Sequence, residues 1–383
     1  MSFFTVIIAT RNRPGPFRQA LQSVLAQSFS DFEVIIVNDG SAEQYQSEYA
    51  SILGVGGSSI RSFALIPRPN GHGGSYARNF GAAEANSPYL CFLDDDDCWT
   101  DRDHLGRAHA VITHSAAPVD LYMTNQAAFL SDERQPGPIW IEDLPPVLAR
   151  LGNRPDQHGA HSVTVDELLQ SGGFCHLNTL VVRRSLYDEV GGMQEAIRWE
   201  EDRDLYLRLI DRAIVIKYSP VTVARHNIPD PAGSGSMTTA LSGLERHLFR
   251  LMVFDRALHL ASHPSIRAHA RQHKAYTLKR ISEALDTAGR PIEAALYARE
   301  ALGTGPTAKW TAYTAWLTLR ATVKSRDRVL TRRSPKPVEE KSVSLWRKWY
   351  FGQVGSQVQL PSPEIEEHLP RTEVPPIPHP TFK

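Results

Sequence analysis

The sequence is poor in cysteine, has no excess of either charge and contains no long hydrophobic run. Its 383 residues include three cysteines, Cys91, Cys98 and Cys175. These have neither the CxxC spacing of a zinc or redox site nor the density of a disulfide framework, which favours a reducing, cytosolic environment. Lys plus Arg and Asp plus Glu both number 42, so no net field attracts nucleic acid and no nucleic-acid partner is expected.

Membrane insertion and secretion are also disfavoured. No apolar run approaches the roughly 20 residues that a transmembrane helix needs. The first ten residues, MSFFTVIIAT, lack the basic start and the cleavage site of a signal peptide. We therefore expect a protein that is soluble in the cytoplasm or lies peripherally on the inner face of the membrane.

Strand-like and helix-like segments alternate in the first part of the chain. Buried strands are expected over residues 3–9, 32–39, 60–66 and 89–94, and helices over 17–29, 45–53 and 75–85. Continuous apolar strands separated by helices indicate a parallel sheet covered on both faces. Ligands bind outside the carboxyl ends of such strands, where Thr10, Asp39 and Asp94 all fall.

We expect this α/β part to extend over residues 1–230. Within it, residues 131–172 are rich in Pro and Gly and are interpreted as an insertion or a flexible lid. A strand over 176–184 and a short helix over 200–213 follow, the helix burying Leu205, Leu209 and Ile210. Two further short strands, AIVIKY and VTVARH, are expected before residue 230.

From about residue 238 the chain changes class. Residues 238–325 are expected to be helical, with one tetratricopeptide-like helix pair over 278–306 that caps the preceding domain. Residues 326–383 are basic and aromatic at first and then Pro-rich, and the Pro-rich last stretch is expected to be extended or disordered. The basic, aromatic stretch over 320–350 is either a surface that docks on anionic lipid or a solvated helix face.

Four consecutive aspartates, Asp94 to Asp97, directly follow the apolar segment 89–93. Two unit charges about 4 Å apart repel by roughly 1 kcal/mol in water and by about 4 kcal/mol near a protein surface, so such a run needs neutralising. Protonation is one route, and a hard divalent cation with oxygen ligands is the better one at neutral pH. Such an ion can stabilise charge on a diphosphate leaving group. The alternative is a solvated acidic turn before the helix that starts near residue 101.

Three segments in a fixed order resemble a known family. They are TVIIATRNRPGPFRQALQSVLAQSFSDFEVIIVNDGS, NGHGGSYARNFGAA and FLDDDDCW. Over roughly residues 3–226 the chain closely resembles the family 2 glycosyltransferases of GT-A fold, inverting enzymes that use nucleotide-diphosphate sugars. The resemblance implies a Rossmann-like, mostly parallel α/β sheet, to which the helical region adds a C-terminal all-α appendage.

Position by position, the resemblance assigns the nucleotide site. Thr10, Arg11 and Asn12 match the loop that holds the nucleotide, and Asp39 matches the acid that hydrogen-bonds the base. Arg78 matches an arginine that lies against the nucleotide and the acids. The alternatives are that Asp39 is a turn residue before Gly40 and that Arg78 is a surface helix residue.

The aspartate run matches the DxD signature of the family. Asp94 is expected to face the ribose, and Asp96 to bind a Mg²⁺ or Mn²⁺ ion that bridges both phosphates. Asp95, grouped with the nucleotide-binding residues, and Asp97 are expected to position their neighbours. His226 stands where some relatives have a histidine that ligates the metal or touches the diphosphate, although a histidine at a strand end is more often ordinary.

The segment WEEDRDLYLRL matches the ED pair of the family. Asp202 is expected to be the general base that takes the proton of the acceptor hydroxyl, with Glu201 as the second candidate. The alternative is that these acids merely suit a helix N-terminus. On the acceptor side, Trp199 is expected to stack on a sugar ring, with a place in the core as the alternative, and His176 and Asn178 are expected to line the cleft. The segment over 131–172 is expected to be an insertion or lid on that side.

The expected activity is that of an inverting, metal-dependent, hexosyltransferase-type enzyme. It would move a sugar from a nucleotide-diphosphate donor, with UDP as the expected carrier, to a hydroxyl of a glycan or lipid-linked glycan in surface polysaccharide or glycoconjugate synthesis. A nucleotide-sugar binding module without turnover and a nucleotidyltransferase are the alternatives. A dinucleotide oxidoreductase is disfavoured because GxGxxG is absent after the first strand. The sequence identifies neither the sugar, nor the acceptor, nor the oligomeric state.

Overall fold

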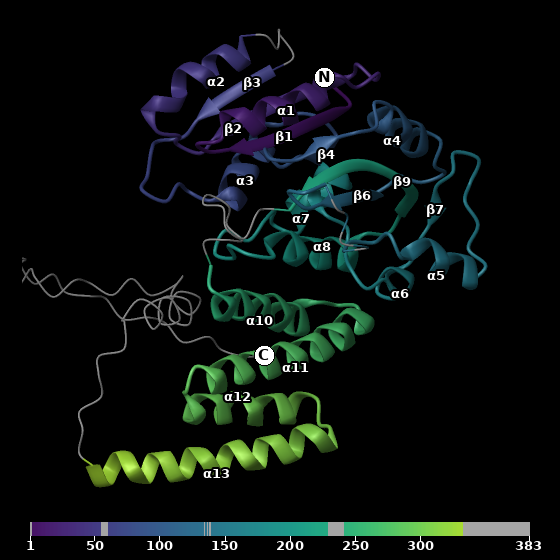
Figure 1. Ribbon diagram of the computed structural model, residues 1–383. Helices are drawn as coiled ribbons and strands as arrows, with labels where there is room; N and C mark the ends of the chain where they lie inside the picture. Colours follow the sequence, from purple (N-terminus) through teal and green to yellow (C-terminus); the bar gives the residue numbers. More distant parts are fainter. Residues whose placement is uncertain are drawn as a thin grey trace, which may run out of the picture. The chain divides into compact units, whose positions relative to one another are not determined.

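The computed structural model describes residues 2–54, 60–133, 135, 137, 139–228 and 241–331, with side chains up to residue 323. Residues up to Ser325 form one compact unit and those from Arg326 a second, of which only the start lies within the described residues. The first unit contains an α/β part followed by a helical part (Figure 1). The predicted Pro-rich tail and most of the basic stretch 320–350 lie outside the described residues.

The described residues of the α/β part form one mixed sheet. Its strands are β1 (Phe4–Thr10), β2 (Phe32–Asn38), β3 (Ile60–Ala64), β4 (Tyr89–Phe92), β5 (Cys98–Trp99), β6 (Leu121–Phe129), β7 (His161–Ser162), β8 (Leu180–Arg183) and β9 (Ile216–Asn227). The order is β3-β2-β1-β4-β8-β6-β9-β5, with β7 pairing to β9. The four strands β1 to β4 are mutually parallel, and β8 runs antiparallel to β4 and β6. The α/β class and the parallel arrangement of the first four strands are confirmed.

Helices cover both faces of this sheet. They are α1 (Pro14–Leu25), α2 (Gln46–Leu53), α3 (Gly74–Glu84), α4 (His104–Thr113), α5 (Leu144–Arg150), α6 (Val165–Leu168), α7 (Arg184–Glu189) and α8 (Glu201–Arg212), with the 3-10 helices η1 (Glu43–Tyr45) and η3 (Leu177–Thr179). Alternate residues of a strand point to opposite faces, so β1 sends Val6 and Ile8 into the core under α1, α2 and α4. Ile7 packs in the other core, with α3, α7 and α8.

One prediction for the middle of the chain is wrong. AIVIKY and VTVARH lie in one strand, β9, instead of two. Met123 pairs with Tyr218 and Asn125 with Thr222, so β9 bulges over residues 219–221, and a bulge is a place where a strand tolerates a proline such as Pro220. Within the predicted insertion or lid over 131–172, α5 buries Leu144 and Leu148 in the core, and α6 buries Leu168. That the segment is an acceptor-side insertion or lid stays a prediction.

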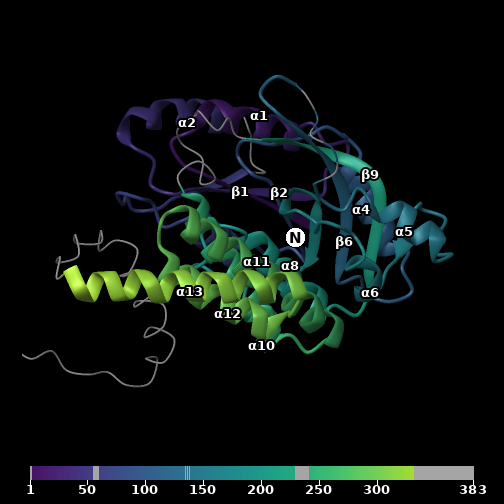
Figure 2. The ribbon, with the colours of Figure 1, turned by 60° about the horizontal axis from the view of Figure 1, so that its bottom comes forward.

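The helical part contains α10 (Gly243–Leu260), α11 (Pro264–Thr287), α12 (Pro291–Thr304) and α13 (Ala308–Thr331). In Figure 1 these helices follow one another in space as they do in the sequence, and Figure 2 views them from the end at which α13 lies. The predicted helix pair corresponds to the second half of α11 together with α12. Val253 and Phe254 of α10 are buried in the same core as α8, which attaches the helical part to the α/β part. None of the helices in the described residues is long and apolar enough to cross a membrane.

Candidate active site

A cleft of about 610 Å³ opens at the carboxyl ends of β1, β2 and β4. The predicted site residues line it, with the exceptions of Asn12, Asn178 and Asp97. It is also lined by residues that the sequence did not assign, among them Arg13, Trp140 and Arg250. Polar groups that are distant in sequence therefore converge on one cavity, as expected for the switch region of a doubly wound sheet.

An arginine partly neutralises the aspartate run. Arg13, directly before α1, donates hydrogen bonds to Asp95 and, at 2.6 Å, to Asp96. Burial raises the pKa of Asp95 to about 7 although Arg13 opposes this shift. The prediction missed Arg13, although it stands in the TRNRPGP segment and a run of four acids calls for a nearby cation.

Asp94 is held by groups from both sides of the cleft. Its carboxylate accepts a hydrogen bond from Arg78 of α3 and lies 3.7 Å from Nε2 of His176. Burial alone would raise the pKa of Asp94, but Arg78 and His176 outweigh it and lower the value to about 2. Asp94 is therefore ionised at neutral pH, and its partner Arg78 reaches on to Glu201, 3.5 Å away.

Asp97 is buried behind the cleft and fixes His226. It accepts hydrogen bonds from Nδ1 of His226 at 2.8 Å, the backbone of Asn227 at 2.7 Å and the side chain of Asn178 at 2.6 Å. Burial lowers the pKa of His226, but the hydrogen bond and charge of Asp97 raise it to about 8. The expectation that Asn178 contacts an acceptor does not fit this structure. Its side chain is buried and is taken up by Asp97, Gln126 and the backbone N–H of Asp94.

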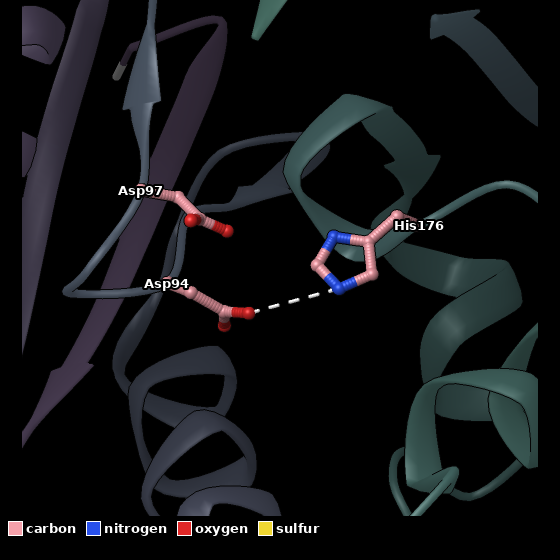
Figure 3. Close-up of side chains that lie close together, drawn as sticks. All are labelled: Asp94, Asp97 and His176. Carbon is pink, nitrogen blue, oxygen red and sulfur yellow. Dashed lines mark ion pairs between the residues drawn. The ribbon is translucent and has the colours of Figure 1, made fainter. Parts of the chain in front are cut away.

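The acids provide a set of ligands that suits a hard cation. Among the described residues, Asp94, Asp97 and His176 each offer one ligand atom, and these atoms lie within 4.8 Å of one another (Figure 3). Carboxylate oxygens beside a polar cleft are the ligands that Mg²⁺ and Mn²⁺ prefer, so the donor set fits such an ion. The predicted ligands Asp96 and His226 are both at the cleft, but in this structure they pair with Arg13 and Asp97.

The predicted base pair lies at the start of α8. Oδ2 of Asp202 is 3.6 Å from Nε2 of His176. Burial, together with the charge of Asp202, raises the pKa of Glu201 to about 7, and burial with the charge of Glu200 raises that of Asp202 to about 6. Burial lowers the pKa of His176 to about 4, so its imidazole is neutral. A carboxylate with a pKa just below neutrality suits a general base.

The loop after β1 and the turn after β2 are braced against each other. Asp39 accepts hydrogen bonds from the backbone N–H groups of His72 at 2.8 Å and Gly73 at 2.9 Å. The side chain of Arg11 donates to the carbonyls of residues 68 and 69 at 3.1 Å, and Thr10 bonds the hydroxyl of Tyr49. Asn12 has a positive φ of 57° and accepts from the backbone of residue 42, so it shapes the loop without lining the cleft.

Comparison with known proteins identifies the α/β part. The sequence model of the family described as "Glycosyl transferase family 2" matches residues 5–190. The succinoglycan biosynthesis protein ExoW of Rhizobium meliloti is 32% identical over 198 residues, which are 50% of this chain and 58% of ExoW. The chain thus spans less than two thirds of this curated relative.

Solved structures share the fold. Residues 1–349 of S. aureus TarS, in complex with UDP-GlcNAc, match with a TM-score of 0.56 at 19% identity, over 78% of this chain and 81% of that one. The mannosyltransferase PcManGT of Pyrobaculum calidifontis, in complex with GDP-Man and Mn²⁺, matches with a TM-score of 0.50 at 16% identity, over 84% and 86%. These similarities confirm the predicted GT-A type of fold.

Proposed function

Because residues 5–190 match the sequence model of glycosyl transferase family 2, we propose that the chain transfers a sugar from a nucleotide-diphosphate donor to a hydroxyl group of a glycan or lipid-linked glycan. The observation that carries this proposal is the convergence of two acid groups on one cleft. Asp94 to Asp96 lie at the end of β4, Glu201 and Asp202 begin α8, and all five line the same cavity.

The donor is proposed to be a UDP-sugar, since a similar fold binds UDP-GlcNAc in TarS. Thr10, Arg11 and Asp39 would hold the nucleotide, with Asp94 near the ribose. Arg78 donates to Asp94 in this structure and would also stabilise negative charge of the diphosphate. Asn12 would act indirectly, through the shape of its loop.

A Mn²⁺ or Mg²⁺ ion is proposed to bind at the aspartates after β4, as a Mn²⁺ ion accompanies GDP-Man in the PcManGT structure. The proposed ligands are Asp96 and His226. Asp94, Asp97 and His176 form a neighbouring cluster whose ligand atoms already lie close together in this structure. When bound, the ion would stabilise negative charge on the departing diphosphate.

Asp202 is the proposed general base of an inverting reaction. In such a reaction the acceptor hydroxyl attacks the anomeric carbon in line with the leaving group, and a base takes its proton. Asp202 and Glu201 line the cleft, and neutral His176 lies 3.6 Å from Asp202, where it can orient that carboxylate. The aromatic side chain of Trp199 also lines the cleft and would stack on an acceptor sugar.

Release of nucleoside diphosphate from a panel of sugar nucleotides, with and without Mn²⁺ or Mg²⁺, tests this proposal. Metal-dependent release, with inversion at the anomeric carbon of the product, is the expected result. Pyrophosphate release would instead favour a nucleotidyltransferase. Tight binding of the donor without any release would favour a binding module.

The biological setting follows from the relatives and stays part of the proposal. ExoW is named for succinoglycan biosynthesis, so we propose a role in making a surface polysaccharide or another glycoconjugate. A cytoplasmic enzyme of this kind would reach a lipid-linked acceptor by docking its basic stretch 320–350 on anionic lipid. Flotation with liposomes containing anionic lipid, with and without residues 320–383, checks this, and unchanged binding of the shortened chain would contradict it.

A further inference from the structure

The residue directly before α8 has an unfavourable backbone conformation. Glu200 has a φ of 60°, in the left-handed region, where a side chain other than Gly or Asn is uncommon. Such a conformation persists only when the surrounding structure holds it. Because Glu201 and Asp202 are the first two residues of α8, whatever holds Glu200 also sets where the proposed base points.

An arginine from the helical part holds Glu200. Nε and Nη2 of Arg250, in α10, donate to Oε1 of Glu200 at 2.9 and 2.6 Å. The guanidinium carbon of Arg250 also lies 5.0 Å from the ring centroid of Trp199. The other carboxylate oxygen of Glu200 lies 3.2 Å from Nε of Arg203 in α8. The guanidinium groups of Arg250 and Arg203, from two different helices, therefore both form ion pairs with the carboxylate of Glu200 at the edge of the cleft.

We propose that Arg250 is a positioning residue for glycosyl transfer. Its hydrogen bonds to Glu200 hold the first turn of α8 in place. Its contact with Trp199 holds the aromatic ring that is expected to stack on the acceptor sugar. The helical part would then complete the active site and not merely cap the domain, since Arg250 itself lines the cleft. This inference rests on the proposed function.

The alternative is that Arg250 only fastens α10 to α8, and the same helix offers a matched control. Arg256 of α10 donates through Nε to Asp204 of α8 at 3.0 Å, and the pair is at least as buried as that of Arg250 with Glu200. Arg256 lines a different cavity, to which neither the aspartates after β4 nor Glu201 and Asp202 contribute. Arg256→Ala therefore removes a comparable ion pair between α10 and α8 and leaves the contacts of Glu200 unchanged.

The experiment uses the full chain and a sugar nucleotide that the wild type turns over. Arg250→Ala is expected to lower kcat of transfer by about 10- to 100-fold, the scale on which misplaced groups act, with the affinity for nucleoside diphosphate and Mn²⁺ unchanged in calorimetry. Arg250→Lys should recover part of kcat, because an ammonium group keeps the charge but not the paired donation. Arg256→Ala should keep the wild-type kcat, although it should lower the melting temperature as much as Arg250→Ala does.

Equal losses of kcat in Arg250→Ala and Arg256→Ala would overturn the inference, as would a loss of nucleotide affinity in the former that matches its loss of kcat. Should Arg250→Ala not fold, Glu200→Gln tests the same clamp. The amide keeps the size of the side chain but not its charge, so kcat should fall in the same direction, and an unchanged kcat would contradict the clamp. A wild type without metal-dependent release of nucleoside diphosphate would reject the proposed function itself.

Discussion

At the scale of single residues, the proposed base can be separated from the donor site. Asp202→Asn replaces a carboxylate at the start of α8 with an amide that cannot take a proton, so kcat of transfer should fall by about 10²- to 10⁴-fold. Nucleotide binding should not change, which calorimetry with UDP and Mn²⁺ would show. Asp188→Asn is the control, because Asp188 is 61% exposed and lies outside the cleft. An active Asp202→Asn variant would move the role of base to Glu201.

The pH dependence of the rate offers an independent check of the same residue. A general base works only when ionised, and burial together with Glu200 raises the pKa of Asp202 to about 6. The value of kcat/KM should therefore rise as the pH increases through about 6 and level off above it. This acidic limb should vanish from the residual activity of Asp202→Asn. A rate that is flat from pH 5 to pH 8 would argue against a carboxylate base of raised pKa.

Asp96 should act on binding as well as on turnover. Its side chain is 30% exposed, lines the cleft and forms an ion pair with Arg13, so a cation can compete for it. Asp96→Ala should abolish transfer and weaken the metal-dependent binding of UDP, whereas Asp202→Asn should affect transfer alone. Isothermal titration of both variants, with Mn²⁺ and with EDTA, measures the difference. Equal affinities in the two variants would reject this division of roles.

How far these residues could be predicted depends on where their partners lie in the sequence. The acids of the cleft were found because they follow strand ends or fall in short family motifs. The partner of Glu200, Arg250, is 50 residues away in a helix with no motif, so no local pattern records the pair. The sequence near Asn178 likewise gives no sign that its side chain donates to Asp97 and Gln126.

At the scale of elements, the position of Arg78 in the cleft depends on the close packing of its helix, α3, against the sheet. A Cβ atom on Gly81 would lie 2.7 Å from Cγ2 of Ile7 and 3.3 Å from Cγ2 of Val37. Gly81→Ala should therefore lift α3 from β1 and β2, lowering the free energy of unfolding by about 1–3 kcal/mol and reducing activity with it.

The matched control for this substitution is Gly303→Ala in α12. A Cβ atom there meets nothing within 4 Å, so alanine should be neutral or should stabilise the protein by about 0.5–1 kcal/mol. Urea unfolding of both variants measures the contrast. If Gly81→Ala is no less stable than Gly303→Ala, the close approach of α3 to the sheet is not a packing constraint.

Elements with a clear local hydrophobic pattern were predicted, whereas elements that depend on pairing with distant segments were not. The segments of β1, β2 and β4 are short apolar runs between helical patterns, which is the pattern of strands buried on both faces. The strand β9 continues through a bulge opposite β6. In the sequence, the Ser219-Pro220 dipeptide at this bulge resembles the end of a strand. The helices α5 and α6 are only seven and four residues long, and α5 has two prolines in its first turn, so composition alone indicated an insertion or lid.

At the scale of the whole molecule, the clustered acids make stability depend on pH and on cations. Burial raises the pKa of Asp95 from 3.8 to about 7, and those of Asp97, Glu201 and Asp202 also rise. Between about pH 4 and pH 7 these four carboxylates bind more protons in the folded protein than in the unfolded chain, so their contribution to stability falls as the pH rises. His104, His176 and His269 act in the opposite direction up to about pH 6.5, because burial lowers their pKa values from 6.5 to about 4. Asp94 acts in the same direction as these histidines, but its lowered pKa matters only below about pH 4.

A divalent ion and a nucleoside diphosphate should therefore stabilise the protein most above neutral pH, where these carboxylates are ionised and repel one another. At 100 times the dissociation constant, ligands that bind only the folded state add about 2.7 kcal/mol. Differential scanning calorimetry should show a larger increase in melting temperature with Mn²⁺ and UDP at pH 7.5 than at pH 5, and Asp96→Ala should reduce it. An equal shift at both pH values, retained in Asp96→Ala or in EDTA, would mean that the ligands bind elsewhere and that the aspartates after β4 do not hold the cation.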